Sequence, residues 1–248
     1  MNKKYLLHLI AIIMVTVLNV SLLSCGSDND DDDIDITPIS LIAGDDKTIQ
    51  GADTISSSNR FVAYGKGNVV HGWHVGEASL VVNGKKRVPI KVLPKYHLYD
   101  DPICNWGCDI NYVKANQKQG VLSGKSTNTL LAYENAGAAS ILSYTFENGK
   151  LKSILAVVST NHASQYGSYL AERYLMLPYY EGENTYFIGA NGTDLDNATT
   201  AVIMQVYSIS QLVTLYLPAQ DYSTRTSRGQ IDIEKIAKEY INQFFMYL

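Results

Sequence analysis

Short stretches of alternating apolar and polar residues, separated by turn residues, run from Thr37 to Pro94. A period of two is typical of strands that bury one face, and no stretch in this range has a helical period. The expected strands cover 39–45, 60–64, 69–73, 78–83 and 87–93. Asn83-Gly84 between the last two predicts a β-hairpin. Residues 37–94 are therefore expected to form an all-β domain.

The pattern changes in residues 120–248, where expected strands and amphipathic helices alternate. The expected elements are a hairpin of 141–146 and 151–158 around Asn148-Gly149, a helix over 163–177, strands over 185–190, 200–207 and 212–217, and a helix from Asp232. The apolar stripe of the last helix consists of Ile233, Ile236, Ala237, Tyr240, Ile241, Phe244 and Leu248. We expect an α+β domain with an antiparallel sheet and two helices on one face.

Two segments of this domain resemble two later ones. Residues 130–135 resemble 186–191, and residues 171–174 resemble 237–240. One interpretation is a pair of βββα repeats that share a single sheet. The other is that unrelated amphipathic elements look alike.

The first 24 residues have the pattern of a secretory signal peptide. Lys3 and Lys4 precede an almost wholly apolar stretch, 6–23, that ends at Ser24-Cys25-Gly26. This ending resembles the lipobox of bacterial lipoproteins. The resemblance implies that Cys25 carries the lipid and begins the mature chain, where more than one acyl chain gives a stable anchor. The alternative is an ordinary signal peptide with an unmodified Cys25.

Six aspartates follow the lipidation site within residues 25–36. A block of like charges repels itself and cannot be buried, so this segment is expected to be a solvated tether. Aspartates directly after a lipidated cysteine also resemble the export signal of Bacteroidetes lipoproteins. That resemblance implies display on the outer face of the outer membrane. The alternative is a plain acidic spacer that faces the periplasm.

The excess negative charge of the chain lies in this tether. The chain has 20 Lys and Arg against 24 Asp and Glu, and residues 1–36 contain two of the lysines and six aspartates. Subtraction leaves 18 basic and 18 acidic residues in the remainder. A neutral body without basic clusters argues against nucleic acid as a partner, because phosphate contacts need concentrated positive charge.

Five segments of the N-terminal half have glycine at turns and valine or alanine at core positions. They are 41–45, 57–63, 67–72, 75–80 and 88–92. Together they resemble the bacterial immunoglobulin-like group 2 domains of intimin- and invasin-type surface proteins, which implies an immunoglobulin-like β-sandwich. The stretch 50–56 is shorter than in that family. It leaves open a sandwich truncated by one or two strands.

Residues 95–119 are expected to connect the two domains, and they contain Cys104 and Cys108. If Cys25 is lipidated, these cysteines remain as an even pair in an oxidising compartment, which favours a disulfide. Two free thiols are the first alternative. A metal site is the second, although Cys-x3-Cys lacks the second cysteine pair of most structural zinc sites. The residues that could complete a metal site are His97, Asp100 and Asp101.

Tyrosine is the main aromatic residue, with 18 copies against 5 phenylalanines and 2 tryptophans. An exposed tyrosine suits stacking on sugars or peptides, whereas tyrosine also fills half-buried sheet faces. The candidate ligand contacts are Tyr179 and Tyr180, expected in a loop over 178–182, and Trp106 between the cysteines. Thr54 follows Asp53 and precedes Ile55, which resembles the O-glycosylation sequon of Bacteroidetes.

Catalytic motifs such as Gly-x-Ser-x-Gly, His-Glu-x-x-His and the P-loop are absent from the sequence. His71 and His74 are three residues apart on an expected strand, so their side chains point to opposite faces and a structural or solvent-facing role is favoured. For His162, near an expected helix start, a cap or surface role is favoured. The remaining candidates are Asp194 to Asn197 as calcium ligands or a polar loop, and Glu134, Glu172 and Asp101 as a carboxylate pair.

The sequence thus predicts a signal peptide over 1–24, a lipidated tether over 25–36, an immunoglobulin-like domain over 37–94, a connection over 95–119 and an α+β domain over 120–248. We expect a non-enzymatic surface lipoprotein for recognition, adhesion or glycan capture, with no catalytic residue, cofactor or metal. Its expected partners are the membrane and a glycan or protein ligand. The alternatives are a glycan- or peptide-directed hydrolase, and a subunit of a surface assembly joined by strand addition.

Overall fold

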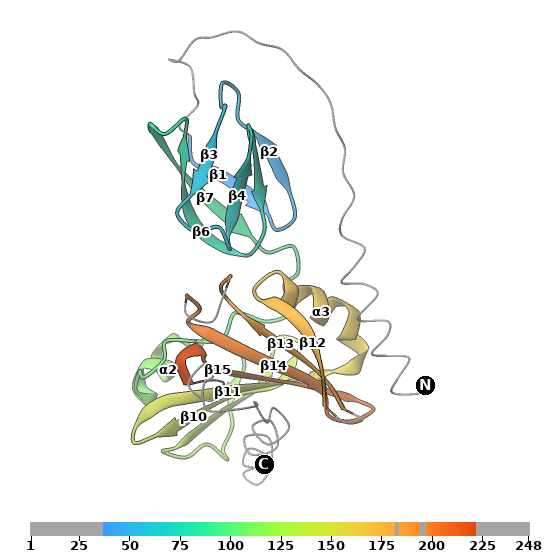
Figure 1. Cartoon of the computed structure of the whole chain (residues 1–248). Coiled ribbons are helices and arrows are strands. Elements are labelled where there is room, and N and C mark those ends of the chain that lie inside the picture. The colour runs from blue at the N-terminus through green and yellow to red at the C-terminus, as the bar shows by residue number, and fades with distance from the viewer. Residues whose placement is uncertain (1–36, 182–183, 194–196, 222–248) are drawn as a thin grey trace. The chain divides into compact units, whose positions relative to one another are not determined.

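The computed structural model describes residues 37–181, 184–193 and 197–221 (Figure 1). This part of the chain consists mostly of β-strands in largely antiparallel sheets, with few helices. It divides into two compact units. The N-terminal unit comprises residues 37–96 and 168–173, and the C-terminal unit comprises 97–167 and the described residues from 174 to 221. The signal peptide, the tether and the helix expected from Asp232 lie outside the described residues.

The described N-terminal unit contains seven strands in two sheets. The strands are β1 (Ile39–Ile42), β2 (Asp46–Thr48), β3 (Ile55–Ser57), β4 (Ala63–Lys66), β5 (Val69–Gly72), β6 (Gly76–Val82) and β7 (Lys86–Leu93). One sheet has the order β1-β7-β6-β3, with β1 parallel to β7, and the other has the order β2-β5-β4. The sequence pattern missed β2 and β3, because three residues are too few to show alternation.

Strand alternation builds the core of this unit. Along β7 every second side chain is buried, and Val88, Ile90 and Val92 pack with Leu80 and Val82 of β6. The predicted β6–β7 hairpin is confirmed, and Asn83 and Gly84 take the left-handed backbone conformation that its turn requires. The alternating faces of two sheets thus enclose one apolar interior.

Eight of the described strands form a single antiparallel sheet in the C-terminal unit. The elements are α2 (Ile110–Asn116), β8 (Val121–Leu122), β9 (Leu130–Ala136), β10 (Ala139–Glu147), β11 (Lys150–Ser159), the 3-10 helix η1 (Thr160–His162), α3 (Ala163–Ala171), β12 (Leu175–Glu181), β13 (Asn184–Ala190), β14 (Thr200–Val206) and β15 (Gln211–Pro218). The strand order is β12-β13-β14-β15-β11-β10-β9-β8. The predicted β10–β11 hairpin around Asn148-Gly149 is confirmed.

The sheet contains two meanders, β9-β10-β11 and β13-β14-β15, whose last strands β11 and β15 pair with each other. This placement agrees with the strand part of the βββα repeat interpretation. Helix α3 follows the first meander, and the helix expected after the second lies outside the described residues. The segment 95–119, expected to be a plain connection, contains α2.

The predicted helix over 163–177 is too long. Helix α3 ends at Ala171, and Leu175 begins the edge strand β12, which pairs with β13 along its whole length. The prediction of a loop over 178–182 is wrong for the same reason, since Tyr179 and Tyr180 lie on β12. The spacing of Tyr174 and Leu177 fits a helix as well as a strand, and pairing with β13 decides between them.

Buried tyrosines form a hydrogen-bonded cluster on one face of this sheet. The Tyr99 hydroxyl lies 2.6 Å from the Tyr216 hydroxyl and 3.0 Å from that of Tyr166 in α3, which donates to Thr214 Oγ1 over 2.7 Å. All three rings are fully buried. Alternation along the strands places a second cluster on the opposite face: Leu130, Leu155, Val157, Tyr186, Ala201, Ile203, Val213, Leu215 and Leu217.

Candidate functional site

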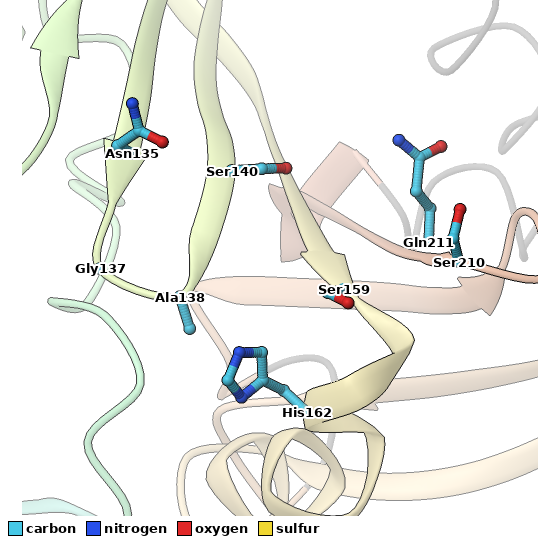
Figure 2. Close-up of a pocket in the computed structure, with 8 residues that line it drawn as sticks. All are labelled: Asn135, Gly137, Ala138, Ser140, Ser159, His162, Ser210 and Gln211. Atoms are coloured by element: carbon cyan, nitrogen blue, oxygen red, sulfur yellow. The ribbon is translucent and has the colours of Figure 1, made fainter.

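An open polar pocket with a volume of about 380 Å³ lies at one end of the central strands of the C-terminal unit (Figure 2). Its lining residues come from four places: the β9–β10 turn, the end of β11, η1 and the start of β15. The eight lining residues are Asn135, Gly137, Ala138, Ser140, Ser159, His162, Ser210 and Gln211. None of them was a predicted ligand contact.

Pairing of β11 with β15 brings two of these places together. Ser159 lies opposite Gln211 in the register of the two strands. Directly after β11, the backbone N–H of Thr160 donates to the carbonyl of Ser210 over 3.1 Å, and the Thr160 hydroxyl donates to the carbonyl of Ile209 over 2.9 Å. These bonds hold η1 against the turn that precedes β15.

The β9–β10 turn forms another wall of the pocket. Asn135 and Gly137 both have positive φ, at 57° and 62°. A Cβ atom at Gly137 would lie 2.5 Å from the carbonyl oxygen of Leu98, so glycine permits a close approach of two backbones here. Ala138 completes the contact by donating its N–H to the same carbonyl over 2.7 Å. The shape of this wall is therefore set by backbone contacts.

Several polar side chains of the pocket are available to a ligand. Within the described part of the chain, the side chains of Asn135, His162 and Gln211 have no hydrogen-bond partner. Figure 2 shows Asn135 and Gln211 on opposite sides of the opening, with the His162 ring below them. Ser140 donates to the carbonyl of Val157 over 3.1 Å and keeps acceptor capacity. The site presents amides, hydroxyls and an imidazole.

Two features used by hydrolases, a carboxylate pair and a serine–histidine hydrogen bond, are not among the described contacts of the pocket lining. Its lining includes no aspartate or glutamate, whereas glycosidases normally need a carboxylate pair. The described hydrogen bonds also do not join His162 to Ser140, Ser159 or Ser210, as activation of a serine nucleophile would require.

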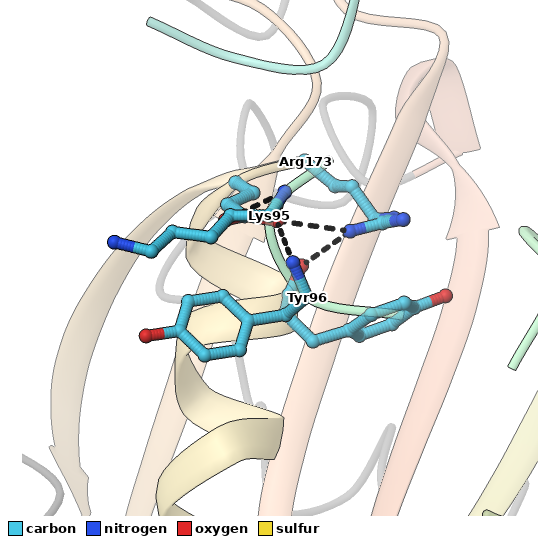
Figure 3. Close-up of polar contacts among 5 residues, drawn as sticks. Lys95, Tyr96 and Arg173 are labelled. Atoms are coloured by element: carbon cyan, nitrogen blue, oxygen red, sulfur yellow. Dashed lines mark hydrogen bonds and ion pairs between the residues drawn. The ribbon is translucent and has the colours of Figure 1, made fainter. Parts of the chain in front are cut away.

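Glu172, one of the three predicted carboxylates, is buried at the end of α3 in the N-terminal unit. It accepts hydrogen bonds from the backbone N–H groups of Lys95 and Tyr96 at 3.1–3.2 Å, and Arg173 Nη1 lies 3.6 Å away. Figure 3 shows Arg173 beside the Lys95-Tyr96 backbone. Burial raises the pKa of Glu172, and the N–H groups and Arg173 oppose the rise. These contacts give Glu172 a structural role.

The other two carboxylates are exposed in the C-terminal unit, Glu134 on β9 and Asp101 in the segment before α2. They belong to a different unit from Glu172. The expected acid–base pair is therefore not assembled from described contacts. Of the calcium candidates, residues 194–196 lie outside the described residues.

Cys104 and Cys108 are both free thiols in the structure, so the disulfide expected from the sequence is not formed there. Burial raises the pKa of Cys104 to about 12, against a hydrogen bond with Thr200 that lowers it. The Trp106 indole N–H donates to Thr200 Oγ1 over 3.1 Å, and its ring is half-buried. The described residues contain no group of three metal-ligating side chains.

Of the predicted contact tyrosines, Tyr180 is 70% exposed, whereas Tyr179 packs against the apolar cluster of the sheet. Thr54 is exposed, and its backbone N–H donates to Asn83 Oδ1 over 3.1 Å. His71 lies on β5 with Nδ1 2.5 Å from Asp46, and His74 is buried against Phe61. These positions agree with the structural or solvent-facing role predicted for the two histidines.

Comparison of the chain with protein-family models, curated proteins and solved structures finds no match. Within the residues that the structure describes, no helix combines the length and the apolar character needed to cross a membrane. The pocket and the sequence patterns are therefore the observations that bear on function.

Proposed function

We propose that this protein is a surface-exposed lipoprotein, anchored in the outer membrane through Cys25, that captures a neutral glycan in the pocket of its C-terminal unit. One observation carries the proposal. The eight described lining residues offer hydroxyls, amides and an imidazole but no Asp, Glu, Lys or Arg. Such groups form hydrogen bonds with sugar hydroxyls without requiring a charged ligand.

The strand order of the N-terminal unit supports the resemblance to immunoglobulin-like domains. In those domains one sheet contains strands B, E and D, and the other contains C, F and G. Here β2-β5-β4 and β3-β6-β7 have the same orders, with β1 added beside β7. In this assignment each of the seven described strands has a counterpart, which supports a complete sandwich, and the short stretch 50–56 runs into a β3 of only three residues, Ile55–Ser57.

The two alternative functions have weaker support. A hydrolase that uses carboxylates would need Asp or Glu side chains, which the described pocket lining lacks. Assembly by strand addition would use an edge such as β12, where Leu177 and Tyr180 are exposed. Pro178 interrupts this edge, and a proline without an N–H group is a common protection against added strands.

Glycan-array binding of the detergent-solubilised full chain, followed by titration with the best oligosaccharide, tests the proposal. The double variant Asn135→Ala and Gln211→Ala removes two hydrogen-bonding groups worth roughly 1 kcal/mol each, so affinity should fall roughly tenfold or more. Tyr180→Ala, an exposed change on β12, is the matched control and should bind like the parent chain.

Three outcomes would contradict the proposal. One is unchanged affinity in the double variant, and a second is loss of affinity in Tyr180→Ala alone, which would place the contact on β12. The third is conversion of the bound oligosaccharide to product, which would indicate a hydrolase.

A further inference from the structure

Five aromatic rings gather in the N-terminal unit, apart from the pocket. Phe61 precedes β4, Tyr64 lies on β4, His71 lies on β5, and Trp73 and His74 lie between β5 and β6. Each ring contacts at least one other, with centroids 3.9–6.4 Å apart. We call these five residues the aromatic cluster. Neither the predicted ligand contacts nor the pocket includes any of them.

The inner part of the cluster is rigidly held. The His74 ring stacks on the Phe61 ring with centroids 3.9 Å apart and an interplanar angle of 5°, and both residues are buried. His74 Nδ1 lies 2.8 Å from the carbonyl oxygen of Phe61, so this nitrogen carries the proton and donates. The backbone N–H of Trp73 donates to the carbonyl of Val62 over 2.8 Å. Phe61 and His74 thus form a buried support for the Trp73 ring.

The outer part of the cluster is open to solvent. Trp73 is 42% exposed, although its ring lies 4.5 Å from His74 and meets Tyr64 nearly edge-on at 5.9 Å and 81°. Tyr64 in turn stacks on His71 at 4.8 Å. An indole held by neighbouring rings but left partly uncovered is a preorganised flat surface, since little side-chain freedom remains to be lost on binding.

A carboxylate completes this surface. Asp46 Oδ1 lies 2.5 Å from His71 Nδ1, and the Asp46 side chain is 56% exposed, so its second oxygen can accept hydrogen bonds. A pyranose ring has an apolar C–H face and a rim of hydroxyl groups. Asp46 is linked to the Trp73 ring through His71 and Tyr64, so the cluster offers an aromatic ring and an acceptor carboxylate for the two kinds of contact.

We propose that the aromatic cluster is a second carbohydrate site, in which one pyranose unit of a neutral polysaccharide stacks on Trp73 and donates a hydroxyl to Asp46. The inference does not depend on the pocket, because it uses different residues in a different unit.

Native affinity electrophoresis of the full chain tests this site. The gels contain one of four soluble probes: laminarin, xylan, mannan or amylose. Retardation by at least one probe is expected, with an at least fivefold loss of affinity in Trp73→Ala and a smaller loss in Trp73→Phe, which keeps an aromatic plane. Asp46→Asn should weaken retardation because an amide is a poorer acceptor than a carboxylate.

Two controls make the result specific. Tyr112→Ala removes an aromatic side chain of similar exposure, 44%, from α2 of the other unit and should migrate like the parent chain. The pocket variant Asn135→Ala with Gln211→Ala should keep the retardation that depends on Trp73, so failure of the pocket proposal is distinguishable. Absence of retardation with all four probes would overturn the inference, as would equal retardation of Trp73→Ala, Trp73→Phe and the parent chain.

Discussion

At the scale of single residues, His74 shows how folding alters chemistry. Its ring contacts the rings of Phe61 and Trp73, and only 2% of the residue is exposed. Burial lowers its pKa from 6.5 to about 4, although the hydrogen bond to the Phe61 carbonyl acts in the opposite direction. Protonation in the folded state would place a positive charge in an apolar stack. His74 is therefore neutral at neutral pH.

This lowered pKa predicts acid destabilisation of the N-terminal unit. The unfolded chain binds a proton at His74 near pH 6.5, and the folded chain does so only near pH 4, so stability rises with pH across this window and is lost as pH falls through it. The full effect is about 3 kcal/mol, from about 1.4 kcal/mol for each pH unit. Urea unfolding at pH 7.5, 6, 5 and 4, followed by tryptophan fluorescence, measures it.

One variant isolates the contribution of His74. His74→Gln is uncharged at every pH and should show a much smaller loss of stability between pH 6.5 and 4 than the parent chain. An equally steep dependence in His74→Gln would assign the effect to other groups.

The tyrosines show what residue counts leave undecided. Their abundance suggested either a contact surface or sheet filling, and three of them, Tyr99, Tyr166 and Tyr216, form a buried hydroxyl network. These residues are separated by 67 and 117 positions from one another along the chain. Composition alone cannot show that tyrosines this far apart in the sequence are in contact in the folded chain. Tyr180 alone of the two predicted contact tyrosines is strongly exposed.

At the scale of elements, the sequence predicted hairpins reliably where the turn residues were specific to one turn type. Both Asn-Gly hairpins were predicted, because positive φ at two successive residues strongly favours this pair. The short strands β2, β3 and β8 and the strand β12 were missed. Pairing with β5, β6 and β9 sets the three short strands, and pairing with β13 sets β12. These pairings are tertiary contacts, which the local spacing of apolar residues does not show.

Gly65 on β4 lies at a close approach to β3, which belongs to the other sheet of the N-terminal unit. A Cβ atom at this position would collide with the carbonyl oxygen and the Cβ of Ile55 on β3. Because one of these atoms belongs to the backbone, the strands would have to separate. We therefore expect Gly65→Ala to destabilise the unit by about 1–3 kcal/mol, in the range of overpacked cores.

Thermal or urea unfolding of Gly65→Ala against the parent chain measures this effect. Lys66→Ala changes the exposed neighbour on the same strand and should stay within about 0.5 kcal/mol of the parent. Equal stability of Gly65→Ala and the parent chain would show that β3 and β4 can separate without cost.

At the scale of the whole molecule, the candidate site illustrates the limit of sequence reasoning. The pocket combines residues near 135–140, 159–162 and 210–211, which meet because β11 pairs with both β10 and β15. The positions of many strands can be predicted from the alternation of apolar and polar residues and from the turn residues. The order of the eight described strands in the sheet depends instead on contacts between segments that are distant in the sequence. Of the lining residues, the sequence analysis singled out only His162, for which it favoured a cap or surface role.

Membrane attachment is a property of the whole molecule, and we expect a single residue, Cys25, to decide it. The body outside residues 1–36 has equal numbers of basic and acidic residues, so it has no net charge to draw it to an anionic lipid surface. We therefore expect retention to depend on acyl chains at Cys25. We expect the parent chain to sediment with outer membranes and to incorporate labelled palmitate, and Cys25→Ala to lose both properties. Cys108→Ala is the matched control and should retain both, because Cys108 lies in the folded body. Sedimentation of Cys25→Ala with outer membranes would show that another segment holds the protein there.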